Sequence, residues 1–203
     1  MFIDETQYKL PSKNYFPVEN VKKQIVLANT NNHDMRHVIG WVNRYNGKYK
    51  KTASFTIDRN GIIHKHFEPK YQSSFFNNLE IDKKTIVILL ENEGWLTHNT
   101  EKNQFITWVG DIYNEVYGVV NKKWKGYDYW CSYTHEQLES VLRLAKKLCV
   151  EFDIPLISLN HNTKIDYIND YTGVLYKSNF EKHYMDLTPA WDYELFKNKL
   201  ELK

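Results

Sequence analysis

The sequence predicts an α/β fold, in which a central mixed β-sheet is flanked by helices within a single domain. Two short apolar runs, residues 24–28 and 85–90, have the length of buried strands. A hairpin signal lies between them, and an amphipathic helix pattern over residues 138–152 follows them. Because strands and helices alternate along the chain, the pattern favours a layered α/β domain.

The first part of the chain, residues 1–21, shows no clear period and contains Pro11 and Pro17. Prolines disfavour helix in the residues before them, so we expect an extended arm laid over the domain. The domain itself should cover residues 22–203. After its first strand, residues 31–34 carry side chains that suit the start of a helix. Four apolar side chains then share one face of this predicted helix: Met35, Val38, Ile39 and Val42.

A β-hairpin is predicted next. Residues 53–58 and 62–67 flank Asn60-Gly61, a pair that readily adopts the positive φ angles of a tight turn. Residues 85–90 then form the most continuous apolar run of the chain, with β-branched side chains at its start. This run predicts the central strand of the sheet.

Residues 95–133 are rich in tryptophan and tyrosine and lack a clean period. They predict a long insertion packed by aromatic side chains. A sugar-binding platform is the alternative, and Trp95 is its best stacking candidate because it follows the central strand closely.

The firmest helix prediction begins at Thr134, which forms a capping box with Gln137. Apolar residues at helical spacing continue from there to Phe152, and Pro155 ends the pattern. Residues 156–159 predict another short strand. A polar loop follows, and residues 193–202 predict a terminal helix.

Composition excludes several classes of protein. The chain of 203 residues has 27 Lys+Arg against 25 Asp+Glu, and a net charge of +2 predicts no nucleic-acid partner. Cys131 and Cys149 match no metal-binding spacing and are expected to be reduced thiols. We expect neither a signal peptide nor a membrane span, so action on a cell wall would need release by lysis or carriage on a virus particle.

Several local motifs, taken in order, resemble the zinc-dependent N-acetylmuramoyl-L-alanine amidases, a family that includes amidase-type phage lysozymes and peptidoglycan recognition proteins. Residues 55–63 resemble the family's hairpin, and residues 85–92 are similar to its central strand, typically Ser-Ile-Gly-Ile-Glu-Leu-Glu-Asn. Residues 160–162 resemble the loop with the family's second zinc histidine, and residues 186–191 resemble its closing segment. The resemblance covers about residues 22–200 and implies the same single-domain fold.

The resemblance implies a zinc site with three protein ligands and one water, which attacks an amide as hydroxide. His161 and Asp186 fall on two of the three ligand positions, but the first falls on Ala28, which cannot bind zinc. The strand glutamate of the family falls on Leu89, and the tyrosine or histidine that opens the hairpin strand falls on residues 53–54. The resemblance therefore implies a degenerate site in which ordinary zinc catalysis is lost.

Other site residues follow from the same resemblance. Glu91 and Tyr184 are the candidate catalytic residues, and Tyr184 falls where the family polarises the scissile carbonyl. Asn29, Asn92 and Trp95 are candidates for substrate contacts. A phenol is a weaker electrophile at neutral pH than the lysine or arginine that many members carry at the position of Tyr184.

Each of these residues also has a structural explanation. His161 and Asp186 could cap loops or turns, and Glu91-Asn92 could form a strand-end turn.

Other histidines offer further alternatives. His33 and His37 could share a helix face and bind metal, although no acidic partner is evident. His64 and His66 alternate on one strand and are expected to be exposed at an edge, with a position facing the cleft as the alternative.

Three functions remain open from the sequence. The chain could be an atypical peptidoglycan amidase, a module that binds peptidoglycan or a muropeptide without cutting it, or a structural protein of a virus particle that reuses the fold. Partners in a virion or an oligomer are compatible with the third.

Overall fold

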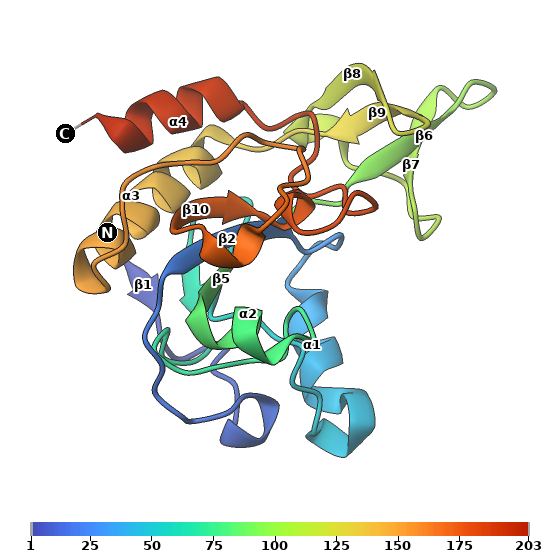
Figure 1. Ribbon diagram of the computed structural model, residues 1–203. Helices are drawn as coiled ribbons and strands as arrows, with labels where there is room; N and C mark the ends of the chain where they lie inside the picture. The colour runs from blue at the N-terminus through green and yellow to red at the C-terminus, as the bar shows by residue number, and fades with distance from the viewer. Residues whose placement is uncertain (1, 203) are drawn as a thin grey trace.

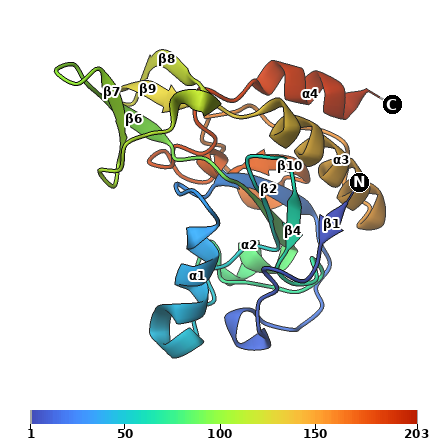
Figure 2. The ribbon, with the colours of Figure 1, turned by 180° about the vertical axis from the view of Figure 1, so that it is seen from behind.

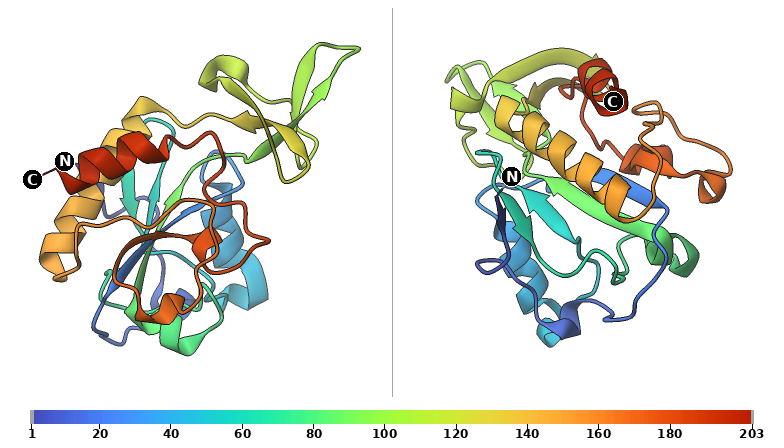
Figure 3. Two further views of the ribbon diagram at one scale, coloured as in Figure 1. Left: turned by 45° about the horizontal axis from the view of Figure 1, so that its top comes forward. Right: turned by 90° about the vertical axis from the view of Figure 1, so that its left-hand side faces the viewer.

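The computed structural model describes residues 2–202, which form three layers around one six-stranded sheet (Figure 1). The strand order is β1-β4-β3-β5-β2-β10. The strands are β1 (Ile3–Asp4), β2 (Gln24–Asn29), β3 (Phe55–Ile57), β4 (Ile63–Lys65), β5 (Thr85–Leu90) and β10 (Gly173–Tyr176). Helices α3 (His135–Glu151) and α4 (Tyr193–Glu201) cover one face, and α1 (Arg36–Asn43) and α2 (Leu79–Lys84) cover the other (Figure 3). The predicted α/β class with a mixed sheet is confirmed.

The centre of the sheet is parallel and completely buried. β5 pairs with β2 on one side and with β3 on the other, and every residue of β2 and β5 is buried. Strands covered on both faces need apolar side chains pointing both ways, which explains the continuous rather than alternating pattern of their sequences. The predicted hairpin is also confirmed, because β3 and β4 pair antiparallel with Phe55 opposite Lys65.

The N-terminal residues add an outer strand to the sheet. β1 pairs parallel with β4, so β4 is not an edge, as Figure 2 shows from behind. The expectation that His64 and His66 are exposed is therefore wrong, since both are buried. Tyr8 packs edge-on against the ring of His64, and its carbonyl accepts a hydrogen bond from His66.

The predicted face of the first helix is confirmed except at Ile39: Met35 and Val38 are buried and Val42 packs against the same apolar cluster. Val38 and Trp41 are buried against the sheet, whereas Ile39 is 58% exposed. Met35 precedes the helix with a positive φ of 55° and provides no side-chain cap. This left-handed residue turns the chain before the helix starts, so the buried face is set by the register from Arg36.

The long helix α3 is confirmed together with its capping box, in which the Thr134 hydroxyl accepts from the Gln137 amide. Its start lies close to the hairpin turn, where Gly61 has a φ of +79°. A Cβ on this glycine would lie 2.6 Å from the carbonyl oxygen of Glu136. The predicted terminal helix is confirmed as α4, and its Phe196 and Leu200 pack into the same core as α3.

Residues 95–131 form a second sheet that projects from the first (Figure 1). Its antiparallel order is β7-β6-β9-β8, and its own core is small, with Leu96, Tyr113 and Cys131 buried. The strands are β6 (Trp95–Asn99), β7 (Gln104–Thr107), β8 (Val119–Trp124) and β9 (Tyr127–Cys131). The sequence of this segment shows no clear strand or helix period because it is rich in aromatic residues. Many of their side chains pack between these strands.

The strand predicted at residues 156–159 is wrong. Only Ser158 forms an isolated bridge, to Val174, and the outer strand on this side is β10. Five short 3-10 turns complete the chain: Ser12–Asn14, Arg44–Gly47, Glu115–Tyr117, Ile168–Asp170 and Lys177–Asn179. None of the helices within residues 2–202 combines the length and the apolar character that crossing a membrane requires.

Candidate functional site

The carboxyl ends of β2 and β5 open into a hollow of about 290 Å³, which we call the basic hollow. In open α/β sheets this edge is where ligands most often bind. The hollow is lined by Asn29, Thr30, Asn31, Asn32, Arg36, His37, Gly40, Trp41, Arg44, Tyr49, Lys51, Phe75, Leu89, Trp108 and Lys177. The hollow therefore lies where β2, β5 and α1 meet. Trp108 from the second sheet and Lys177, which follows β10, also line it.

The first predicted ligand position holds no donor. Ala28 is fully buried on β2 and pairs in register with Leu89 of β5. Both pack into the apolar cluster beneath α1. The positions of the family's first zinc ligand and its strand glutamate are thus two neighbouring hydrocarbon side chains.

Asp186 is buried, and both of its carboxylate oxygens have partners. Oδ1 accepts a 2.9 Å hydrogen bond from the backbone amide of Asn29, and Oδ2 lies 3.2 Å from the ammonium of Lys177. The Lys177 side chain is 18% exposed and that of Asp186 5%, so the pair is largely removed from water. A buried carboxylate requires such a counter-charge, and here the lysine provides it.

Both ring nitrogens of His161 also have partners. Nε2 lies 2.7 Å from the carbonyl oxygen of Leu187, which can only accept, so Nε2 carries the proton. Nδ1 then accepts from the side-chain amide of Asn162 at 3.3 Å. Burial lowers the pKa of His161 to about 4, so the ring is neutral at physiological pH.

These residues do not fit a catalytic zinc ion, which needs three donors converging on one point. Ala28 has no donor atom, and His161 donates its proton to the carbonyl of Leu187. The carboxylate of Asp186 is held by Lys177 and by the backbone amide of Asn29. Within residues 2–202 no group of three or more histidine, cysteine, aspartate or glutamate side chains could hold a metal ion.

Glu91 and Asn92 lie directly after β5 and are both buried. Burial raises the pKa of Glu91, opposed by the backbone amides of Asp34 and Arg59. The Asn92 side chain donates to the carbonyls of Cys131 and Ser132 at 3.1 and 3.2 Å and accepts from the amide of Gly94. These bonds tie the end of the central strand to the second sheet, and neither residue lines the basic hollow.

Asn29 is the predicted substrate residue that does line the hollow. Its side-chain oxygen accepts a 2.6 Å hydrogen bond from the hydroxyl of Tyr133. Trp95 packs between Trp108 and Tyr127, with ring centroids 6.1 and 4.8 Å away. It is Trp108 that reaches the hollow, where its indole N–H donates to the carbonyl of Asn31 at 2.9 Å.

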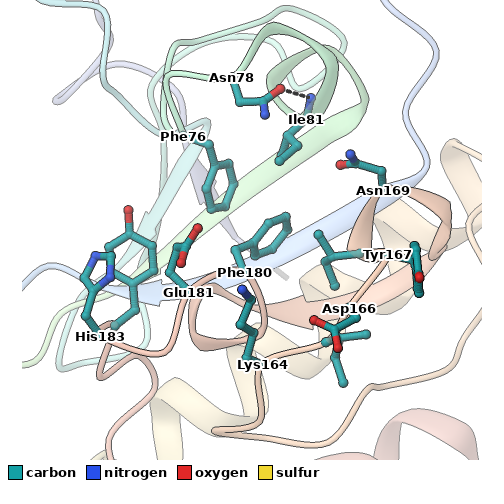
Figure 4. Close-up of a pocket in the computed structure, with 13 residues that line it drawn as sticks. Phe76, Asn78, Ile81, Lys164, Asp166, Tyr167, Asn169, Phe180, Glu181 and His183 are labelled. Carbon is teal, nitrogen blue, oxygen red and sulfur yellow. Dashed lines mark hydrogen bonds between the residues drawn. The ribbon is translucent and has the colours of Figure 1, made fainter.

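Tyr184 does not line the basic hollow, but its ring packs against Lys177. The ammonium of Lys177 lies 4.3 Å from the centre of the Tyr184 ring. The tyrosine lines a separate, larger hollow of about 610 Å³ beside α2. Figure 4 shows this hollow, in which Phe76 and Phe180 stack while Lys164, Asp166 and Glu181 bring both signs of charge. Such a mixed lining favours no particular charge of ligand.

His33 and His37 do not form a pair. Nδ1 of His33 lies 3.2 Å from Oε1 of Glu93. His33 therefore has an acidic partner, which was not evident from the sequence. Burial raises the pKa of Glu93, and the nearby His33 opposes the shift.

His37 belongs to a chain of hydrogen bonds beneath α1. His66 Nδ1 must carry a proton, because it contacts the Tyr8 carbonyl at 2.8 Å. Its Nε2 then accepts from the Thr56 hydroxyl at 2.8 Å, and the same hydroxyl accepts from His37 Nε2 at 3.0 Å. Burial lowers the pKa of His66 to about 4 and that of His37 to about 3, so both rings are neutral. His37 Nδ1 is left as a buried lone pair with no partner within residues 2–202.

Lys177, Arg44 and Lys51 were not predicted from the sequence, and His37 was considered only as a possible metal ligand beside His33. No motif marks them, since a lysine after a short strand is unremarkable in a sequence. Lys177 meets Asp186 only because β10 pairs beside β2 and brings residue 177 back to the same edge of the sheet.

The fold is that of the N-acetylmuramoyl-L-alanine amidases and endolysins, which confirms the expected resemblance at the level of architecture. The chain is similar to the N-acetylmuramoyl-L-alanine amidase LysC from Clostridium intestinale URNW, with 15% identity, a TM-score of 0.55, and coverage of 100% of this chain and 99% of that one. It is similar to PlyL, with 12% identity, a TM-score of 0.57 and coverage of 100% and 98%. For a mutant endolysin from Bacillus subtilis the identity is 14%, the TM-score 0.56 and the coverage 98% and 99%. No protein-family model and no curated protein sequence matches the chain.

Proposed function

We propose that this protein binds peptidoglycan or its muropeptide fragments through the basic hollow and does not hydrolyse them by zinc chemistry. The shared fold with amidases supports a ligand of this class. One observation supports the loss of zinc chemistry. Lys177 and the backbone amide of Asn29 together hold the carboxylate of Asp186, and the neighbouring residue of β2 is Ala28, which has no donor atom.

The test has three measurements on the purified full-length protein. Retention on insoluble peptidoglycan should be the same with and without a chelator. Mass spectrometry should find far less than one zinc per chain, and a suspension of purified walls should keep its turbidity. Zinc bound at one per chain together with falling turbidity would refute the proposal.

A matched pair of variants locates the binding surface. Trp108→Ala removes an aromatic side chain that is 49% exposed at the rim of the hollow and should reduce wall retention about fivefold. Phe2→Ala removes an exposed aromatic that lines a different hollow and should leave retention unchanged. Equal effects of the two changes would count against the basic hollow as the binding surface.

A structural role in a larger particle is the second candidate. It is favoured by an exposed apolar segment of the second sheet, in which Val109, Ile112 and Val116 are each more than half exposed. Such a segment is typical of a surface that another protein covers. A protein that stays monomeric at high concentration and is retained on walls would favour the binding role.

A further inference from the structure

The basic hollow has a charge that the rest of the molecule does not share. Four cationic side chains line it, and no aspartate or glutamate is among its lining residues. The cations are Arg36, Arg44, Lys51 and Lys177. Four other hollows on the described part of the chain each include at least one carboxylate. Since the whole chain has a net charge of only +2, this concentration of positive charge is local.

Two of the four cations have no ion-pair partner in the part of the chain that the structure describes, and a third has only a weak one. Within residues 2–202, Arg44 and Lys51 form no ion pair, and Arg44 lies 5.5 Å from the centre of the Tyr49 ring. Arg36 is 3.5 Å from Asp111, but both side chains are more than half exposed, so the attraction is weak. Lys177 alone is committed, to Asp186.

The hollow has both polar and aromatic lining residues. Thr30, Asn31 and Asn32 contribute short polar groups, and the neutral ring of His37 carries the lone pair left without a partner. Trp41, Tyr49 and Trp108 contribute rings. A ligand that suits this lining combines negative charge with groups able to hydrogen-bond and an apolar edge.

We infer that the basic hollow is a binding site for a small oxyanion ligand with at least two negative charges, carried by carboxylate or phosphate groups. Guanidinium and ammonium groups are the usual means of holding such groups, and here Arg44 and Lys51 have no carboxylate partner within residues 2–202. The hollow's charge and lining carry this inference. Assigning the ligand to a wall fragment rests additionally on the proposed function.

Calorimetric titration of the full chain at low salt, with pyrophosphate and with citrate as probes, tests the site. The variant Arg44→Gln/Lys51→Gln removes two unpaired cations and should weaken binding about tenfold or more. Its matched control, Arg143→Gln/Lys147→Gln, removes the same charge from exposed positions on α3, on the other face of the sheet, and should change binding less than about twofold. Equal weakening by both variants, or no binding of either probe, would overturn the inference.

Two further ligands separate the sources of negative charge. A muropeptide with free stem-peptide carboxylates and an oligomer of glycerol phosphate are titrated against the same three proteins. Binding of either one that is weakened only by Arg44→Gln/Lys51→Gln supports the inference and names the source. If the small probes bind but neither wall ligand does, the anion site stands and the proposed function fails. If the protein is retained on walls but no anion binds, the anion site is refuted and the proposed function stands.

Discussion

The ammonium of Lys177 lies 3.2 Å from Oδ2 of Asp186, and Oδ1 of the same carboxylate accepts the backbone amide of Asn29. The lysine thus supplies within the chain the positive charge that a buried carboxylate needs. Lys177 follows β10 and lines the basic hollow, whereas Asp186 is not among the lining residues.

Replacing Lys177 should lower the stability of the fold, because the buried carboxylate of Asp186 would lose its counter-charge. Lys177→Met leaves a buried carboxylate without its counter-charge and should lower the free energy of unfolding by about 2–4 kcal/mol. Adding Asp186→Asn should restore much of the loss, because a neutral amide can still accept from Asn29. Urea denaturation of the two single variants and the double variant measures the coupling.

The exposed pair Lys199–Glu139 provides the control, since both side chains are more than a third exposed. Lys199→Met should cost less than about 1 kcal/mol. Strictly additive effects of the two substitutions at 177 and 186 would show that the ion pair does not contribute.

The hydroxyl of Thr56 should be essential to the hydrogen-bond chain beneath α1. Thr56→Val keeps the shape of the side chain but removes the partner of Nε2 on both His37 and His66. We expect a loss of about 2–4 kcal/mol in the free energy of unfolding, because two buried ring nitrogens lose their partners. Thr97→Val, at an exposed position of β6, should change it by less than about 0.5 kcal/mol.

Nitrogen NMR of the wild-type rings tests the same chain directly. His66 should be protonated at Nδ1 and His37 at Nε2. The opposite tautomer on either ring would contradict the deduced direction of the hydrogen bonds.

One fully buried and two partly buried histidines should make the protein less stable in mild acid. Burial lowers the pKa of His37 to about 3 and those of His66 and His161 to about 4, while the unfolded chain has the ordinary value of about 6.5. The unfolded state therefore binds more protons below pH 6.5, and stability falls as pH decreases from there toward about 4. Each histidine contributes a slope of roughly 1.4 kcal/mol per pH unit.

Urea denaturation at several pH values between 7.5 and 5 measures this slope. His161→Gln removes one titrating ring while its amide can still donate to the Leu187 carbonyl, so the slope should fall by about one histidine's share. A pH-independent free energy of unfolding over this range would contradict the neutral, buried state of these rings.

The close approach of the hairpin turn to α3 can be measured with alanine. Gly61→Ala places a Cβ 2.6 Å from the Glu136 carbonyl at a positive φ and should destabilise the fold by about 2 kcal/mol or more. Gly126→Ala has a similar φ of +88° but no atom within 4 Å, so it should cost only about 1 kcal/mol. Equal losses at the two positions would show that the contact with α3 is not tight.

The resemblance to amidases at the level of the fold could be recognised from the sequence because it rests on local patterns. The buried runs of β2 and β5, the turn at Asn60-Gly61 and the capping box of Thr134 each encode their element within a few residues. Strand β10 was missed because its four residues, including a glycine, give too little signal without knowledge of its neighbour.

The sequence by itself determined the order of the main elements and the absence of a ligand at Ala28, since these depend on side-chain identity and short-range spacing. Only the tertiary structure decided that His64 and His66 are buried, that Lys177 holds Asp186, and that four cations line one hollow. These facts depend on contacts between segments far apart in the chain, such as β1 with β4 and β10 with β2. The free energy of burial and of ion pairing is set by those neighbours, which no local pattern specifies.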